Sequence, residues 1–147
     1  MMLRKKLLAS LALAFAFSAT APAFAAENQD VIDYRQRIMK TLDAQVAALG
    51  QILSGATPDD QVVSHLETIA LAAEQSMKSF DAKVEGGESL PIVWTKADDF
   101  SAKMKDFVAK TRAAADTAKA QGKDAALTNI LDALRCKDCH DVYRKKQ

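Results

Sequence analysis

The stretch DAALTNILDALRCKDCHDVYRK, residues 124–145, decides the fold that this sequence predicts. Its apolar residues recur at helical spacing, which predicts one amphipathic helix from about Asp124 to Lys145. The expected packing stripe of this helix consists of Leu127, Ile130, Leu131 and Leu134. The same stretch holds both cysteines of the chain, so it also carries the most distinctive chemistry.

The two cysteines and a histidine form the sequence Cys136-Lys-Asp-Cys139-His140. Cys-x-x-Cys-His is the attachment motif of c-type haem. On a helix, residues three and four apart share one face. The two thiols can therefore form thioethers with the haem vinyl groups while the imidazole of His140 reaches the iron. At about 100° per residue, this face points away from the leucine stripe, so one helix could hold a haem and pack on its neighbours.

Three other uses of the cysteines remain open from the residues alone. A disulfide is favoured in an oxidising compartment, but a three-residue loop inside a helix constrains little. A thioredoxin-like dithiol needs a βαβ context, which the sequence lacks. A zinc site needs about four ligands, and the only other histidine, His65, is expected on the solvated face of a helix.

Helical periodicity extends over the rest of the chain. In residues 31–53, apolar residues recur every seven positions at Ile32, Met39, Val46 and Leu53. Arg35 falls in the register of Leu42 and Leu49, where an apolar residue would be expected. Gly55 is expected to follow the end of this helix.

Two more helices are predicted between residues 57 and 122. Thr57 suits an N-cap and Pro58 a first helical position, so a second helix is expected to begin there. Its apolar stripe is Val62, Leu66, Ile69, Ala73, Met77 and Phe80. A third helix is expected from about Lys96 to Gly122, after an irregular stretch at 81–91. Four amphipathic helices predict an all-α protein, an antiparallel four-helix bundle.

The first 25 residues resemble a secretory signal peptide. Arg4, Lys5 and Lys6 precede an apolar run over 7–17, and Ala23-Phe-Ala25 fits a cleavage site. The alternative, a membrane anchor, needs about 20 apolar residues. We therefore expect a cleaved leader over 1–25, one domain over 26–147 and a periplasmic protein with no membrane association after cleavage.

The charge balance excludes one class of function. The chain has 20 basic and 19 acidic residues, and loss of three basic residues with the leader leaves 17 against 19, a net charge of −2. A near-neutral domain without a basic stripe is a poor nucleic-acid ligand.

The chain resembles the class II c-type cytochromes, the cytochrome c′ family, in which the haem motif lies near the C-terminus on the last of four helices. The ending Cys136-Lys-Asp-Cys-His-Asp-Val-Tyr-Arg144 carries most of this resemblance. Tyr34-Arg-Gln-Arg-Ile-Met-Lys40, Glu85-Gly-Gly87 and Pro91-Ile-Val-Trp94 are similar to other motifs of the family.

The resemblance implies roles for residues outside the haem motif. It places Arg35 and Gln36 near the haem propionates, with Glu85 in a loop that contributes to the cofactor site. A carboxylate partner would explain an Arg in an apolar register, while the alternative is an Arg that extends to solvent. Arg144 would lie beside His140.

Met39 stands at the distal position of the family. If its thioether binds iron as the sixth ligand, the protein suits electron transfer with redox partner proteins and has no catalytic turnover. If Met39 only blocks the iron, the alternative is a five-coordinate protein that binds small gases such as nitric oxide or carbon monoxide. The family also implies a homodimer through the first two helices.

Overall fold

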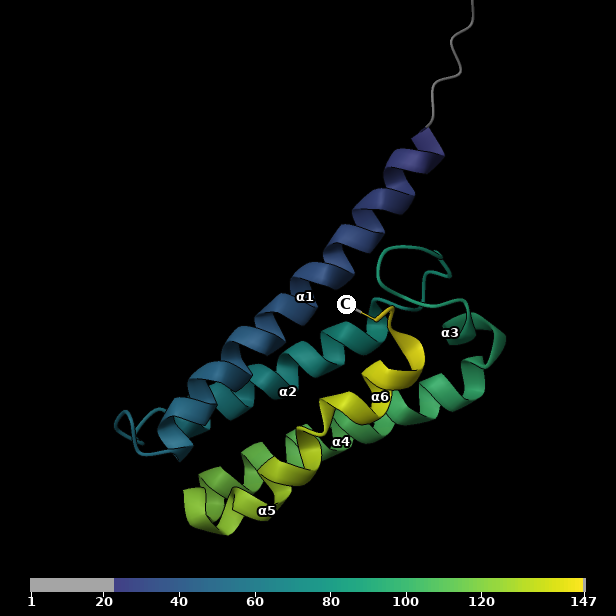
Figure 1. Cartoon of the computed structure of the whole chain (residues 1–147). Helices are drawn as coiled ribbons and strands as arrows, with labels where there is room; N and C mark the ends of the chain where they lie inside the picture. The colour runs from purple at the N-terminus through teal and green to yellow at the C-terminus, as the bar shows by residue number, and fades with distance from the viewer. Residues whose placement is uncertain (1–22, 147) are drawn as a thin grey trace, which may run out of the picture.

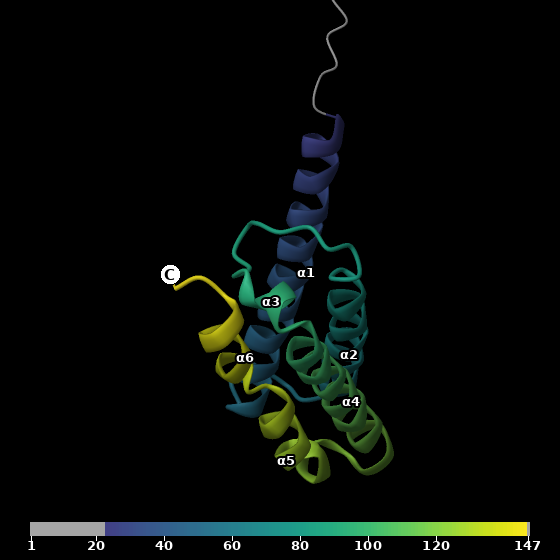
Figure 2. The same cartoon turned by 90° about the vertical axis from the view of Figure 1, so that its right-hand side faces the viewer.

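The computed structural model describes residues 23–146, which are helical with no β-strand. The long helices are α1 (Ala23–Leu53), α2 (Val62–Lys78) and α4 (Ala97–Gln121), and the short ones are α3 (Ile92–Thr95), α5 (Lys123–Ala133) and α6 (Cys136–Tyr143). Figures 1 and 2 show α1 beside α2 and α4 beside α5, with α6 continuing the direction of α5. The predicted all-α four-helix bundle is confirmed, and α5 and α6 together form its fourth member.

One side of the bundle is open. The packed pairs are α1 with α2, α2 with α4, and α4 with α5, while α3 contacts both α4 and α6. Among residues 23–146, α1 forms no comparable pair with α5 or α6. The helix that carries Met39 therefore faces the helix that carries His140 without packing on it.

Two clusters of buried side chains support the two ends of the bundle. The larger joins α1, α2, α4 and α5 through residues such as Leu49, Leu66, Ala115 and Ile130. The smaller joins α3, α4 and α6 and consists of Val93, Phe100, Met104 and Tyr143. Phe80 and Cys139 pack against this second cluster, so the second core lies directly beneath α6.

The predicted single helix from Asp124 to Lys145 is wrong in one respect, because it breaks at Leu134 and Arg135. The α5 segment buries Ala126, Ile130 and Ala133, whereas α6 buries Tyr143. In one continuous helix Tyr143 would lie about 100° away from the buried face of α5. The break rotates α6 relative to α5, so that Tyr143 of α6 and the buried face of α5 both point into the protein.

The predicted leucine stripe of this segment is only partly correct. Ile130 is fully buried, but Leu127 and Leu131 are 41% and 63% exposed. The buried neighbours of Ile130 on α5 are Ala126 and Ala133, and Ala126 shares a core with Ala114, Ala115 and Ala118 of α4. Small side chains on both helices allow close approach, so the alanines face the core instead of the larger leucines.

The second helix begins later than predicted. The α2 helix starts at Val62 after Gln61, and Thr57 and Pro58 lie in the preceding turns. Asp59 forms an ion pair with Lys123 at 2.9 Å, which ties this connection to the start of α5. By contrast, α1 ends at Leu53 and Gly55 adopts φ +76°, as the sequence indicates.

The predicted signal peptide lies outside the described residues except for 23–25, which belong to α1. Within residues 23–146, no helix is both long and apolar enough to cross a membrane.

Candidate haem site

The attachment motif opens α6. Cys136 is its first residue and is exposed, while Cys139 and His140 are half-buried. Both cysteines are free thiols. Their spacing on a helix puts the two thiols and the imidazole on one face, as predicted. An ion pair of 2.6 Å between Arg135 and Asp138 holds the first turn of α6.

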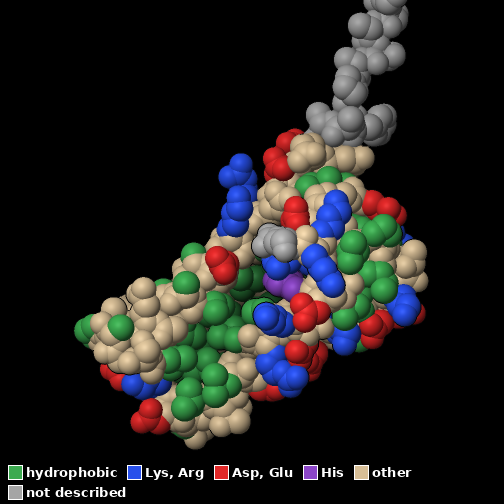
Figure 3. All heavy atoms as spheres, viewed as in Figure 1, with side chains coloured by type: hydrophobic (Ala, Val, Ile, Leu, Met, Phe, Trp, Pro, Cys, Tyr) green, Lys and Arg blue, Asp and Glu red, His purple; other side chains and the backbone are tan. Residues whose placement is uncertain are grey.

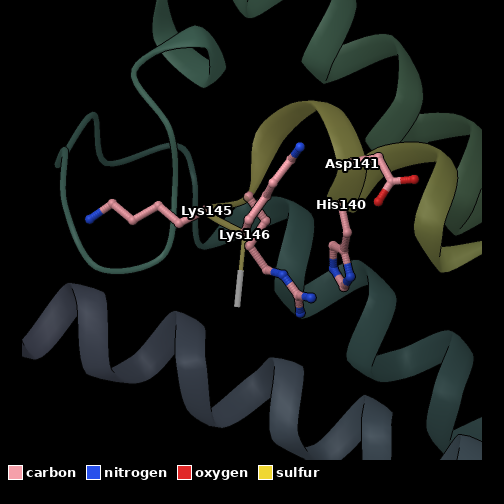
Figure 4. A pocket seen from close by; sticks show the side chains of 5 residues that line it. His140, Asp141, Lys145 and Lys146 are labelled. Atoms are coloured by element: carbon pink, nitrogen blue, oxygen red, sulfur yellow. The ribbon is translucent and has the colours of Figure 1, made fainter.

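His140 lies at the edge of a hollow in the open side of the bundle. Figure 3 shows a hollow on this face with a histidine side chain at its edge, between apolar side chains on one side and charged side chains on the other. Figure 4 shows the imidazole pointing away from α6 into the hollow, while Asp141 points to the other side. Asp141, Arg144, Lys145 and Lys146 complete the lining of a cavity of about 270 Å³ next to the ring.

Burial sets the protonation of the three motif side chains. Desolvation, and then the nearby charge of Arg144, lower the pKa of His140. Desolvation also raises the pKa of the Cys136 and Cys139 thiols. At neutral pH the imidazole is therefore neutral, the form in which its nitrogen can bind iron.

The end of the chain is held beside this site by main-chain hydrogen bonds. The N–H of Lys145 donates to the carbonyl of Glu88, and the N–H of Leu90 donates to the carbonyl of Tyr143. Ser89 and Arg144 form an isolated antiparallel bridge. Arg144 is thereby fixed one turn after His140, as the family resemblance implies.

Met39 lies in the middle of α1, on the helix that borders the open side. It is half-buried and packs against the larger core, whereas its neighbour Ile38 is fully buried. Arg35 lies one helical turn before it. Met39 is therefore partly accessible on α1, and its contact with a bound haem stays a prediction.

Arg35 is buried, so the alternative of an Arg extending to solvent is wrong. Its side chain is only 5% exposed and donates hydrogen bonds to the carbonyls of Ser79, Ala82 and Val84. Burial lowers the pKa of its guanidinium. These bonds use three of five N–H groups, so two remain for a carboxylate, and the propionate contact stays a prediction.

The other two residues implied by the resemblance lie near the glycine-rich loop. Gln36 is half-buried, and a Cβ built on Gly87 would lie 3.3 Å from its Nε2 atom. Glu85 is exposed in the same loop. Their contacts with a haem stay predictions.

The donor set fits haem better than a zinc ion. Within residues 23–146, no group of three or more His, Cys, Asp or Glu side chains could hold a metal ion. His65 is half-buried and hydrogen-bonds the amide of Gln45 at 2.7 Å, so its predicted solvated position is wrong. Two thiols and one imidazole on one face of a helix instead match a haem attached through sulfur.

Sequence reasoning treated Phe80, Phe100 and Tyr143 only as packing residues or left them out. They form edge-to-face contacts that run from the end of α2 to α6. Tyr143 also donates a hydrogen bond to Asp99 of α4. The only hint of these Tyr143 contacts in the sequence is that Tyr143 lies three residues, about one helical turn, after His140.

Comparison with known proteins agrees with this geometry. A family model described as Cytochrome C′ matches residues 30–144. A cytochrome c′ of Alcaligenes xylosoxydans xylosoxydans is 28% identical over 127 residues, which cover 83% of this chain and 98% of the relative. A cytochrome c-554 of Cereibacter sphaeroides is 33% identical over 152 residues, which cover 92% and 96%.

Solved structures give the same match at the level of the fold. The nitrosyl complex of a cytochrome c prime variant from Alcaligenes xylosoxidans superposes with a TM-score of 0.76 at 26% identity. The match covers 82% of this chain and 98% of that structure.

Proposed function

Because the chain belongs to the cytochrome c′ family, it is a c-type cytochrome that binds one covalent haem and transfers electrons, and we propose that Met39 serves as its sixth iron ligand. The observation that carries this proposal is the position of α1 and α6 on opposite borders of the open side of the bundle. The α6 helix presents His140, and α1 presents a half-buried thioether.

The chain's own residues divide the work of holding the cofactor. Cys136 and Cys139 fix it to α6, and neutral His140 binds on one side. A bound haem supplies a one-electron ferric–ferrous couple. Met39, a soft ligand, stabilises the ferrous state and raises the reduction potential. If His140 and Met39 both bound the iron of such a haem, no substrate would have access to the metal, which supports a carrier with no catalytic turnover.

The cellular setting belongs to the same proposal. The leader pattern of residues 1–25 supports export to the periplasm. Tyr34 on α1 and Leu71 on α2 are each 52% exposed, which supports a homodimer through these helices. Redox partner proteins would then meet the haem on the open side, between α1 and α6.

The rival function is binding of small gases. A relative with the same fold is known as a nitrosyl complex, and a distal Met39 that does not reach the iron would leave one axial position free. The two functions differ in one measurable property, the coordination of the iron.

The deciding experiment compares the wild type with Met39→Leu and with Met104→Leu. Met104 is buried in the second core and provides a matched thioether-to-leucine control. We expect a low-spin oxidised wild type with the near-infrared band of sulfur-to-iron charge transfer, and slow uptake of carbon monoxide after reduction. Met39→Leu should be high-spin with a lower reduction potential, and Met104→Leu should resemble the wild type. A high-spin wild type at neutral pH would overturn Met39 ligation and favour gas binding.

A further inference from the structure

Four side chains form a continuous row from α1 to α6. The guanidinium carbon of Arg35 lies 4.6 Å from the ring centre of Phe80. Phe80 meets Phe100 edge to face at 4.9 Å between ring centres, and Phe100 meets Tyr143 in the same way at 5.1 Å. We call Arg35, Phe80, Phe100 and Tyr143 the aromatic row.

The two ends of the aromatic row lie beside the two axial residues. Arg35 is four residues before Met39 on α1, and Tyr143 is three residues after His140 on α6. On a helix these separations amount to about one turn. A shift of Arg35 would therefore also shift Met39 on α1, and a shift of Tyr143 would also shift His140 on α6.

Both ends of the row are fixed. Arg35 donates to three carbonyls of residues 79–84, and its guanidinium also lies 5.8 Å from the ring centre of Trp94. Tyr143 is 3% exposed and donates to the carboxylate of Asp99. Neither side chain can change rotamer without breaking a buried or half-buried hydrogen bond.

Within residues 23–146, α1 and α6 are not one of the packed helix pairs, and helix packing connects them only through α2, α4 and α3. We propose that the aromatic row is a spacer that sets the separation of Met39 from His140, and so decides whether both side chains reach one iron. Arg35, Phe80, Phe100 and Tyr143 act here as positioning residues. This proposal rests on the family's haem site and deepens the proposed function.

The row has room to relax on one side. Phe80, Trp94 and Phe100 line a cavity of about 260 Å³ together with Met77 and Met104. Because a well-packed core resists small movements whereas a cavity does not, removing part of one ring would let the row shift. A smaller side chain at Phe80 or Phe100 should therefore loosen the distance between α1 and α6.

The test compares Phe80→Leu and Phe100→Leu holoproteins with Phe107→Leu. Phe107 is a half-buried phenylalanine of α4 that packs against the larger core, outside the row, so it controls for the loss of ring volume. The spin-state equilibrium is followed by absorption and electron-spin spectra against temperature, and global unfolding is measured separately.

We expect Phe80→Leu and Phe100→Leu to shift the spin-state equilibrium toward the high-spin form, in which Met39 is not bound, by about threefold to tenfold. This is the range expected for the loss of one edge-to-face contact. Phe107→Leu should lower stability without this shift. Spin-state shifts that follow the loss of global stability equally in all three variants would overturn the spacer. If a leucine variant does not accumulate, Tyr143→Phe keeps the ring, frees the end of the row and should shift the equilibrium in the same direction.

The proposal that the aromatic row is a spacer and the proposal that Met39 is the sixth ligand can be overturned independently. A high-spin wild type overturns Met39 ligation, and the spacer is then read from the rate of carbon monoxide binding to the reduced protein. That rate should change in Phe80→Leu and Phe100→Leu and stay unchanged in Phe107→Leu. Equal rates in the wild type and all three variants would overturn the spacer.

Discussion

The hydroxyl of Tyr143 on α6 donates a hydrogen bond to the carboxylate of Asp99 on α4. Burial, and then this hydrogen bond, raise the pKa of Tyr143 to about 12. The helix that carries His140 is thus fixed to the bundle by a hydrogen bond from a phenol to a carboxylate.

This pair predicts loss of stability in alkali. An unfolded tyrosine has a pKa of about 10, so the contribution of Tyr143 is complete below pH ~10 and is lost as pH rises toward ~12. Tyr143→Phe should lower the free energy of unfolding by about 1–2 kcal/mol at pH 8, and its difference from the wild type should narrow above pH ~10. Urea unfolding at both pH values checks this. Tyr34→Phe, at an exposed site, should change neither value.

Gly87 should not tolerate a side chain. Its φ is +60°, and an added Cβ would lie 2.7 Å from Cγ2 of Ile32 on α1. Gly87→Ala should therefore destabilise the protein by about 1–3 kcal/mol in thermal unfolding. Gly50→Ala is the control, since Gly50 is helical with nothing within 4 Å of an added Cβ, and should stabilise by about 0.5–1 kcal/mol. Equal effects of the two substitutions would contradict the close approach of the loop to α1.

Arg35→Lys tests the bonds to the 79–84 segment. A lysine keeps the charge but cannot reach three carbonyls with one planar group. We expect a loss of about 2–3 kcal/mol in denaturant unfolding. Arg37→Lys, on the exposed face of the same helix, should stay within about 0.5 kcal/mol of the wild type. If Arg35→Lys leaves the free energy of unfolding unchanged, the hydrogen bonds to the three carbonyls do not contribute to stability.

Covalent attachment is checked by extraction. Haem should stay with the wild-type chain in acid acetone, because two thioethers hold it. Cys136→Ala combined with Cys139→Ala should release it, whereas His65→Ala should not. Extraction of haem from the wild type would contradict covalent attachment through Cys136 and Cys139.

Export is checked by mass spectrometry. The mature holoprotein should begin at or next to Ala26 and occur in the periplasmic fraction. A chain that lacks residues 1–25 should accumulate without haem, since c-type haem is attached on the exported side. A holoprotein that still carries Met1 would contradict the prediction that residues 1–25 are a cleaved signal peptide.

Features that depend on neighbouring residues in the sequence could be predicted. The haem motif needs only the spacing of Cys136, Cys139 and His140, and the end of α1 needs only periodicity and Gly55. The register anomaly at Arg35 was also visible, but its partners are carbonyls 44 to 49 residues away, which no local pattern reveals.

Features that depend on which surfaces meet could not be predicted. The break after α5 arises because α4 takes the alanine face while the second core takes Tyr143, and helical periodicity continues through it without a signal. His65 was assigned to solvent because its partner Gln45 lies on another helix. In each case the contact is made by the tertiary fold.

The break between α5 and α6 also bears on the order of assembly. The three long helices are synthesised before the attachment motif, and their core does not require α6. Cys136 stays exposed in the folded chain, and α6 is a separate helix after the break at Leu134 and Arg135. Because the larger core contains no described residue of α6, we expect collapse of that core and formation of the thioethers to be separable events.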